Sequence, residues 1–184
     1  QSISKSVMNL ILGKLVESKL VDLTKNVKHY LPEIGSGYAE ATIQQVLDMD
    51  VINNFDENYD ASYEHDTQVG APVGYNREEI ALGWRLPPEG EQQFSSREFA
   101  ASLVSNNVVN TTGYTEYRSP NTDILGWIAE TATERTLIEF LIEIIEATGI
   151  EGTYHIGLDC DGIPQFAGGA CMTGCVNGCI RLPI

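Results

Sequence analysis

A serine and a lysine stand three positions apart near the amino end of the chain, in Ser2-Ile3-Ser4-Lys5. In a helix, residues three apart lie on the same face, about one turn from each other. A serine hydroxyl is a weak nucleophile until a base takes its proton, and a lysine held away from water can act as that base. The helix N-terminus adds positive potential where an oxyanion would form. The spacing indicates a serine nucleophile with a lysine base; the plainer interpretation is a helix cap followed by a solvated lysine.

A second candidate segment lies at residues 117–126, which read Tyr-Arg-Ser-Pro-Asn-Thr-Asp-Ile-Leu-Gly. Its pattern is a polar turn that enters a helix, with a tyrosine just before the cap. A tyrosinate near a lysine can take a proton from a serine and pass it to a leaving group. Taken alone, Tyr117 is explained more simply as a half-buried ring with a hydrogen-bonded hydroxyl.

Together, these segments resemble the serine β-lactamase and penicillin-binding-protein superfamily, on its class C and esterase-like side. Ser2 and Lys5 match its S-x-x-K motif, and Tyr117-x-Ser119 stands where that family has Tyr-x-Asn or Tyr-x-Ser. The phrase Tyr-Arg-Ser-Pro-Asn-Thr-Asp is most similar to the nylon-oligomer (6-aminohexanoate-dimer) hydrolases and related carboxylesterases. The further stretches that resemble the family are 5–6, 20–23, 27–33, 41–49, 121–127 and 163–173.

The resemblance implies a hydrolase that works through an acyl-enzyme. Ser2 would attack the carbonyl of an amide, ester or lactam, and its backbone N–H would supply half of the oxyanion hole. Lys5 and Tyr117 would share the general-base and general-acid roles, and water would then release the acyl group. Ser119 and the pair Gly168-Gly169 would contact the substrate, a small molecule, and no cofactor is implied.

Both ends of the chain depart from the family pattern. The family's fold has an antiparallel sheet whose strands come before the nucleophile helix and near the C-terminus, but one residue precedes Ser2. The third motif, a Lys- or His-containing strand that supplies the second oxyanion donor, is missing. A longer protein, a deliberate fragment and a truncated gene are three explanations. We expect residues 1–184 to form a single, incomplete β-lactamase-like domain, and the alternative function is a non-catalytic remnant or a helical interaction domain of the same family.

The expected fold class is α+β and predominantly helical, with a few short antiparallel strands. Apolar periodicity over 4–20 predicts a first helix that is buried on most sides. Capping boxes, Asn76-x-x-Glu79 and Ser95-x-x-Glu98, open two later helices. The remaining predicted elements are helices over 27–31, 42–49, 121–132 and 136–148, a strand over 154–158 and a hairpin turn at 161–162.

Residues 53–74 are acidic, aromatic and poor in aliphatic side chains, which predicts a long surface loop. The plainer interpretation is a solvated surface. If the loop closes over the cleft, its charge favours neutral or cationic substrates over anionic ones. That would suit amides with a free amine and would count against penicillins, which carry a carboxylate.

The composition is that of a globular chain and excludes some partners. Among 184 residues, 42% are hydrophobic and 20% charged, and the net charge is −15. Binding phosphates requires Lys and Arg, so this charge argues against nucleic acid and against an anionic membrane surface. No apolar stretch is long enough to span a membrane. The oligomeric state stays open.

The cysteines and histidines give no metal signature. Three of the four cysteines form a C-x3-C-x3-C pattern, unlike the C-x2-C of zinc knuckles. We interpret the thiols as buried or incidental, with a disulfide or a metal site as alternatives, and the compartment stays open between periplasmic or secreted and cytoplasmic. Residues 159–162 suggest a hairpin turn more than a calcium loop. The four cysteines are Cys160, Cys171, Cys175 and Cys179. The three histidines, His29, His65 and His155, lie far apart in the sequence.

Overall fold

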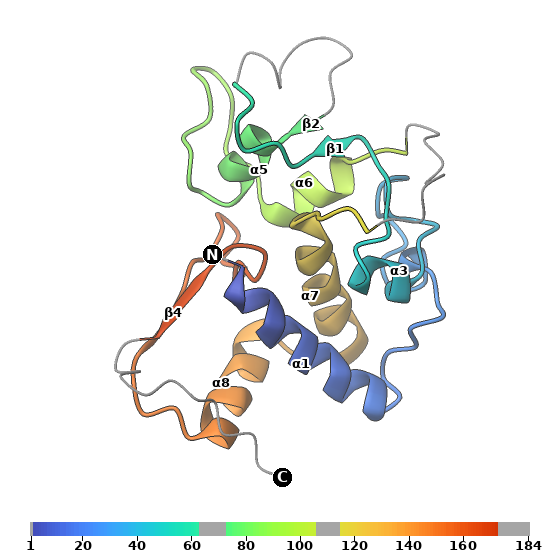
Figure 1. Ribbon diagram of the computed structural model, residues 1–184, viewed down its shortest axis with the longest axis vertical. Coiled ribbons are helices and arrows are strands. Elements are labelled where there is room, and N and C mark those ends of the chain that lie inside the picture. The colour runs from blue at the N-terminus through green and yellow to red at the C-terminus, as the bar shows by residue number, and fades with distance from the viewer. Residues whose placement is uncertain (1, 63–72, 106–114, 173–184) are drawn as a thin grey trace.

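Helices surround one long central helix in this computed structural model, which describes residues 2–62, 73–105 and 115–172 (Figure 1). The central helix is α7 (Pro120–Thr133), which contacts helices from both halves of the chain. Its neighbours are α1 (Ile3–Glu17), α2 (Val27–Tyr30), α3 (Ile43–Leu47), α6 (Ser96–Ser102) and α8 (Leu137–Thr148). The helix α5 (Tyr75–Ala81) packs against α6 at one end of the molecule. Among the described residues, none of the helices is long and apolar enough to cross a membrane.

The first helix packs against α7 through one apolar stripe. Its buried side chains recur at steps of three and four residues, which places them on one face; they are Met8, Ile11, Leu12 and Leu15. Gly126 of α7 lets the helices approach, because a Cβ there would lie 2.9 Å from Leu137 and 3.1 Å from Met8. The opposite face of α1 exposes Ile3 and Leu10, so the expectation of burial on most sides is not met.

Three helices begin with the reciprocal hydrogen bonds of a capping box. Thr42, Ser95 and Thr136 each accept a hydrogen bond from the backbone N–H three residues ahead, and the side chain there bonds back. The capping boxes at Thr42 and Thr136 add to the predicted one at Ser95, and Gly149 ends α8 in the left-handed conformation, as predicted. The capping box predicted at Asn76 is wrong, because the N-cap of α5 is Gly74, two positions earlier, and Asn76 lies inside the helix.

Two short strand pairs frame the ends of the helical body. The strands β1 (Phe55–Asp56) and β2 (Val73–Gly74) are parallel, with Phe55 opposite Val73. The strands β3 (Tyr154–Ile156) and β4 (Ala170–Met172) are antiparallel, and a turn through Gly162 lies between them. The segment predicted as a surface loop, 53–74, has a strand near each end, and Phe55 is buried in the core; its residues 63–72 lie outside the described residues.

Candidate active site

Ser2 stands immediately before α1, at the end of the helix that faces the strands of the second pair. Its backbone is left-handed, with φ 61°, a conformation that costs a residue with a side chain about 1 kcal/mol or more. Its N–H donates a hydrogen bond to the carbonyl oxygen of Gly168 at 2.7 Å. This N–H, expected to serve an oxyanion, would have to leave that carbonyl first.

The hydroxyl of Ser2 lies between a phenol and an amine. Its Oγ is 2.7 Å from the hydroxyl oxygen of Tyr117 and 3.2 Å from Nζ of Lys5. The Lys5 amine also lies 5.2 Å from the centre of the Tyr117 ring. The three side chains that the sequence proposed as catalytic are therefore brought together, although 115 positions separate Ser2 from Tyr117.

Lys5 is held by three acceptors. Besides Ser2, its Nζ donates to the hydroxyl of Ser119 at 3.1 Å and to the carbonyl oxygen of Ala167. An ammonium group has three hydrogens to donate, so this arrangement matches a protonated lysine with each hydrogen in use. Ser4, on the same turn, donates to the carbonyls of Phe166 and Gly168. The start of α1 is thus tied to the segment 166–168 by several hydrogen bonds.

A network of buried polar groups sets the start of α7. Asn121 accepts a hydrogen bond from the hydroxyl of the fully buried Tyr38 at 2.8 Å and donates to the carbonyl of Val46. Arg118, also buried, donates to the carbonyl of Phe55, the first residue of β1. These contacts fix both Ser119 and the strand that leads to Glu57.

Glu57 is a site residue that the sequence placed only in an acidic loop. Its carboxylate accepts hydrogen bonds from the hydroxyl of Ser119 at 2.7 Å, from the Ser119 backbone N–H, and from the hydroxyl of Tyr59 at 2.5 Å. A loop carboxylate has no periodicity that would mark it. Only the pairing with Ser119 shows that it belongs to the site.

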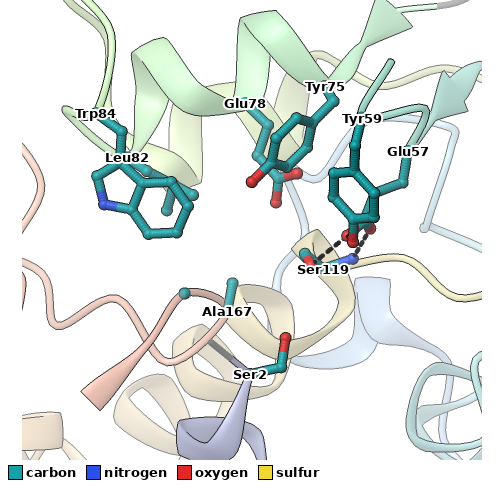
Figure 2. Close-up of a pocket in the computed structure, with 10 residues that line it drawn as sticks. Ser2, Glu57, Tyr59, Tyr75, Glu78, Leu82, Trp84, Ser119 and Ala167 are labelled. Carbon is teal, nitrogen blue, oxygen red and sulfur yellow. Dashed lines mark hydrogen bonds between the residues drawn. The ribbon is translucent and has the colours of Figure 1, made fainter. Parts of the chain in front are cut away.

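The pocket next to Ser2 has one aromatic and acidic wall that comes mainly from α5 and the chain around it (Figure 2). The cavity is narrow: the space that the centre of a water molecule can occupy is about 10 Å³, which is room for one water. The residues that line it are Ser2, Glu57, Tyr59, Tyr75, Glu78, Leu82, Trp84, Ser119, Ala167 and Gly168.

Of the two predicted glycines, only Gly168 lines this pocket. A Cβ at Gly168 would lie 2.6 Å from the ring of Trp84, so the ring can rest there only on a glycine. The Trp84 indole N–H donates to the side chain of Gln165 at 3.1 Å, and Gln165 in turn donates to the carbonyl of Leu82. The α5 wall is thereby fixed over the segment 166–168. Gly169 does not line the cavity.

Two carboxyl groups near Lys5 have perturbed acidity. Burial raises the pKa of Glu78 well above its ordinary range, the charges of Glu57 and Asp123 raise it further, and the charge of Lys5 opposes them. Burial likewise raises the pKa of Asp123 to about 7, against the lowering effect of Lys5 and of a hydrogen bond from the Ala167 N–H. Glu78 was missed in the sequence, where it lies inside the supposed capping box and next to a second glutamate.

Cys160 and the turn at 159–162 do not line the pocket. Cys160 is an exposed free thiol, and Cys175 and Cys179 lie outside the described residues. Asp159 accepts hydrogen bonds from Ser96 and from the backbone of its own turn, so it closes a hairpin and caps α6. Within the described residues, no group of three or more His, Cys, Asp or Glu side chains could hold a metal ion.

Comparison with known proteins gives matches over most of the chain. The beta-lactamase family model matches residues 1–159. A 6-aminohexanoate-dimer hydrolase of Paenarthrobacter ureafaciens is 32% identical over 142 residues, which are 76% of this chain and 33% of that protein. A solved structure described as a 6-aminohexanoate-dimer hydrolase from Bacillus anthracis superposes with a TM-score of 0.70 at 23% identity, covering 92% of this chain and 42% of that one. The chain therefore spans about a third to two fifths of the length of these relatives, and the predicted α+β, mainly helical fold class is confirmed.

Proposed function

The chain belongs to the beta-lactamase family, and from this premise we propose that it is a serine hydrolase that cleaves an amide, ester or lactam bond through an acyl-enzyme at Ser2. The family resemblance expected from the sequence is confirmed, and the named relatives are hydrolases. The catalytic residues and the steps that follow are our proposal.

The observation that supports this function is the placement of the Ser2 hydroxyl between Tyr117 and Lys5, at 2.7 and 3.2 Å. Both distances are those of hydrogen bonds, which is the reach a proton-transfer partner needs. An ordinary surface serine would have neither a lysine amine nor a tyrosine hydroxyl within hydrogen-bond distance of its own hydroxyl.

In the proposed reaction, Tyr117 starts as the phenolate, and the Ser2 oxygen attacks the substrate carbonyl as its proton moves to the Tyr117 oxygen. Lys5, which donates to Ser2, Ser119 and the Ala167 carbonyl, stabilises the deprotonated phenol through its charge. Tyr117 then protonates the leaving group as the C–N or C–O bond breaks. A water molecule next attacks the acyl-serine ester and gives its proton to Tyr117, which passes it to the Ser2 oxygen as the ester bond breaks. Glu57 holds Ser119, and Ser119 holds Lys5.

A second candidate function is a non-catalytic domain of the same family. Two observations favour it: the Ser2 N–H is bonded to the Gly168 carbonyl, and the cavity has room for only one water. The Ser2 N–H can serve an oxyanion only if it first leaves the Gly168 carbonyl.

Labelling with a fluorophosphonate probe and with a penicillin, read by mass spectrometry of the intact protein, separates the two functions. The hydrolase predicts one adduct, on Ser2, that is lost in Ser2→Ala and kept in Ser6→Ala, a control on the exposed side of the same helix. Hydrolysis of 4-nitrophenyl esters should follow the same pattern. Full activity in Ser2→Ala would remove the proposal, and an absence of labelling and turnover in the wild-type protein would favour the non-catalytic function.

A further inference from the structure

Asp123 lies in the first part of α7, on the side of the helix that meets the start of α1. It follows Ser119 by four positions, which places the two residues on the same face of α7, about one turn apart. Lys5 donates a hydrogen bond to the Ser119 hydroxyl at 3.1 Å, and its charge acts on the Asp123 carboxyl group. Successive turns of α7 therefore bring a hydroxyl and a carboxyl group to the same amine.

The carboxyl group of Asp123 also holds the peptide that holds Lys5. It accepts a hydrogen bond from the backbone N–H of Ala167, and the carbonyl oxygen of Ala167 accepts one from Lys5 Nζ. A hydrogen bond from an N–H to a carboxylate is stronger than one to a neutral acceptor. Ala167, which is 2% exposed, thus links the acid on α7 to the amine on α1.

Fold stability alone does not explain an acid at this position. Burial raises the pKa of Asp123 to about 7, so the surroundings disfavour its charged form at pH values where an exposed aspartate is fully ionised. An asparagine of the same shape could accept the same N–H without that cost. Only the negative charge of a carboxylate, which favours the ammonium form of Lys5, distinguishes the two side chains.

We propose that Asp123 is a positioning residue, which acts on the reaction through Lys5. Its carboxylate keeps Lys5 charged and, through the peptide of Ala167, holds the amine within reach of the Ser2 hydroxyl. Asp123 touches neither the substrate nor the reacting atoms, so it affects kcat more than KM. The inference rests on the proposed hydrolase function.

The proposal makes the reaction depend on the ionisation of Asp123. The charges of Lys5 and of Arg97 on α6 favour its carboxylate form, and the charge of Asp159 disfavours it. The charge of Asp123 in turn raises the pKa values of Glu78 on α5 and of Tyr38. Because the pKa of Glu78 is itself raised, a comparison with a variant of Asp123 is needed to isolate its contribution.

The test measures kcat and KM of the intact protein for 4-nitrophenyl acetate between pH 5.5 and 8.5. Asp123→Asn keeps the shape and the acceptor but removes the charge, so kcat should fall about tenfold at pH 8.5 with little change in KM. At pH 5.5, where the wild-type carboxyl group is mostly neutral, the loss should be less than about twofold. A merely structural role would give the same loss at both pH values. Asp48→Asn, the same change at the exposed C-cap of α3, should match the wild-type protein throughout.

Two further measurements do not depend on Asp123→Asn folding correctly. Asp123→Glu retains the charge on a longer side chain, and it should keep at least about a third of the wild-type kcat at pH 8.5. In the wild-type protein, kcat should rise about fivefold or more from pH 5.5 to 8.5.

Three results would overturn the inference: equal losses in Asp123→Asn at both pH values, a tenfold loss in Asp123→Glu at pH 8.5, or a flat wild-type profile. If any of them comes with hydrolysis that depends on Ser2, the inference alone fails. Hydrolysis that survives Ser2→Ala, or no hydrolysis by the wild-type protein, removes the proposed function and the inference with it.

Discussion

The polar groups on the α1 and α7 wall of the pocket are saturated with hydrogen bonds, whereas the carboxyl group of Glu78 on the α5 wall has no partner among the described residues. On the first wall, each donor of Lys5 meets an acceptor. On the second wall, rings and a leucine enclose one acid. The first arrangement holds its groups in place without any ligand. The second leaves a buried carboxyl group without a hydrogen-bond partner among the described residues, which costs stability.

The largest effect should come from Lys5, the centre of the saturated wall. Lys5→Ala removes the charge that stabilises deprotonated Tyr117 and frees three acceptors, so kcat on 4-nitrophenyl esters should fall by about a thousandfold or more. Lys14→Ala is the control: Lys14 lies on α1 like Lys5, its exposed ion pair is with Glu143 of α8, and the variant should stay near wild type. A Lys5→Ala enzyme with more than about a tenth of the wild-type kcat would contradict the role.

Tyr117→Phe should give the next largest effect. The ring remains and the proton acceptor is lost, so we expect kcat to fall by about a hundredfold or more while KM changes little. Tyr30→Phe serves as control. Tyr30 lies at the end of α2, outside the pocket, and its hydroxyl accepts a hydrogen bond from the Asp22 N–H. A rise in KM with unchanged kcat would assign Tyr117 to substrate binding and not to proton transfer.

Asp123 should make stability depend on pH. Its pKa is raised to about 7 by burial, so the folded protein keeps a proton that the unfolded chain loses from about pH 4 upward. The contribution of Asp123 to stability is therefore fully present below the unfolded pKa of 3.8 and is lost as the pH rises to about 7. Between pH 4 and 8, the free energy of unfolding of Asp123→Asn should therefore fall by about 2 kcal/mol less than that of the wild-type protein. This difference is smaller than the full pKa shift implies, because water reaches part of the carboxyl group. If the free energies of unfolding of both proteins, measured by urea denaturation, fall in parallel between pH 4 and 8, the prediction is wrong.

The smallest effect concerns stability on the two walls. Glu78→Met replaces the unpartnered acid by an apolar side chain of similar length, and the free energy of unfolding should rise by about 1 kcal/mol. Asn121→Ala breaks bonds to Tyr38 and Val46 beside the saturated wall and should lower it by about 2 kcal/mol. Urea denaturation measures both. If Glu78→Met is the less stable of the two variants, the two walls do not differ as described.

Local patterns in the sequence predicted the features that are formed by residues close together in the chain. The three-residue spacing of Ser2 and Lys5 sets their common face, and the Ser95 capping box and the Gly149 stop are formed by residues within a few positions. Tyr117 was reached only through the family resemblance, because nothing local joins it to Ser2.

The α5 wall could not be predicted in the same way. Glu78 and Glu79 are adjacent acids, and only the packing of α5 on α6 decides that the first is buried while the second pairs with Arg85. Glu57 is recognised only when β1 is held beside α7 by Arg118. The sequence also placed the start of this helix at Asn76, two positions too late, since Gly74 is its N-cap.

The hydrogen bonds between the start of α1 and the segment 166–168 bear on when this part of the fold can form during synthesis. Ser2, Ser4 and Lys5 all donate to carbonyls that lie more than 160 positions later in the chain. Contacts at such separation form last, because the loop between them must close first. The start of α1 can therefore reach the position described here only after residue 168 has been synthesised.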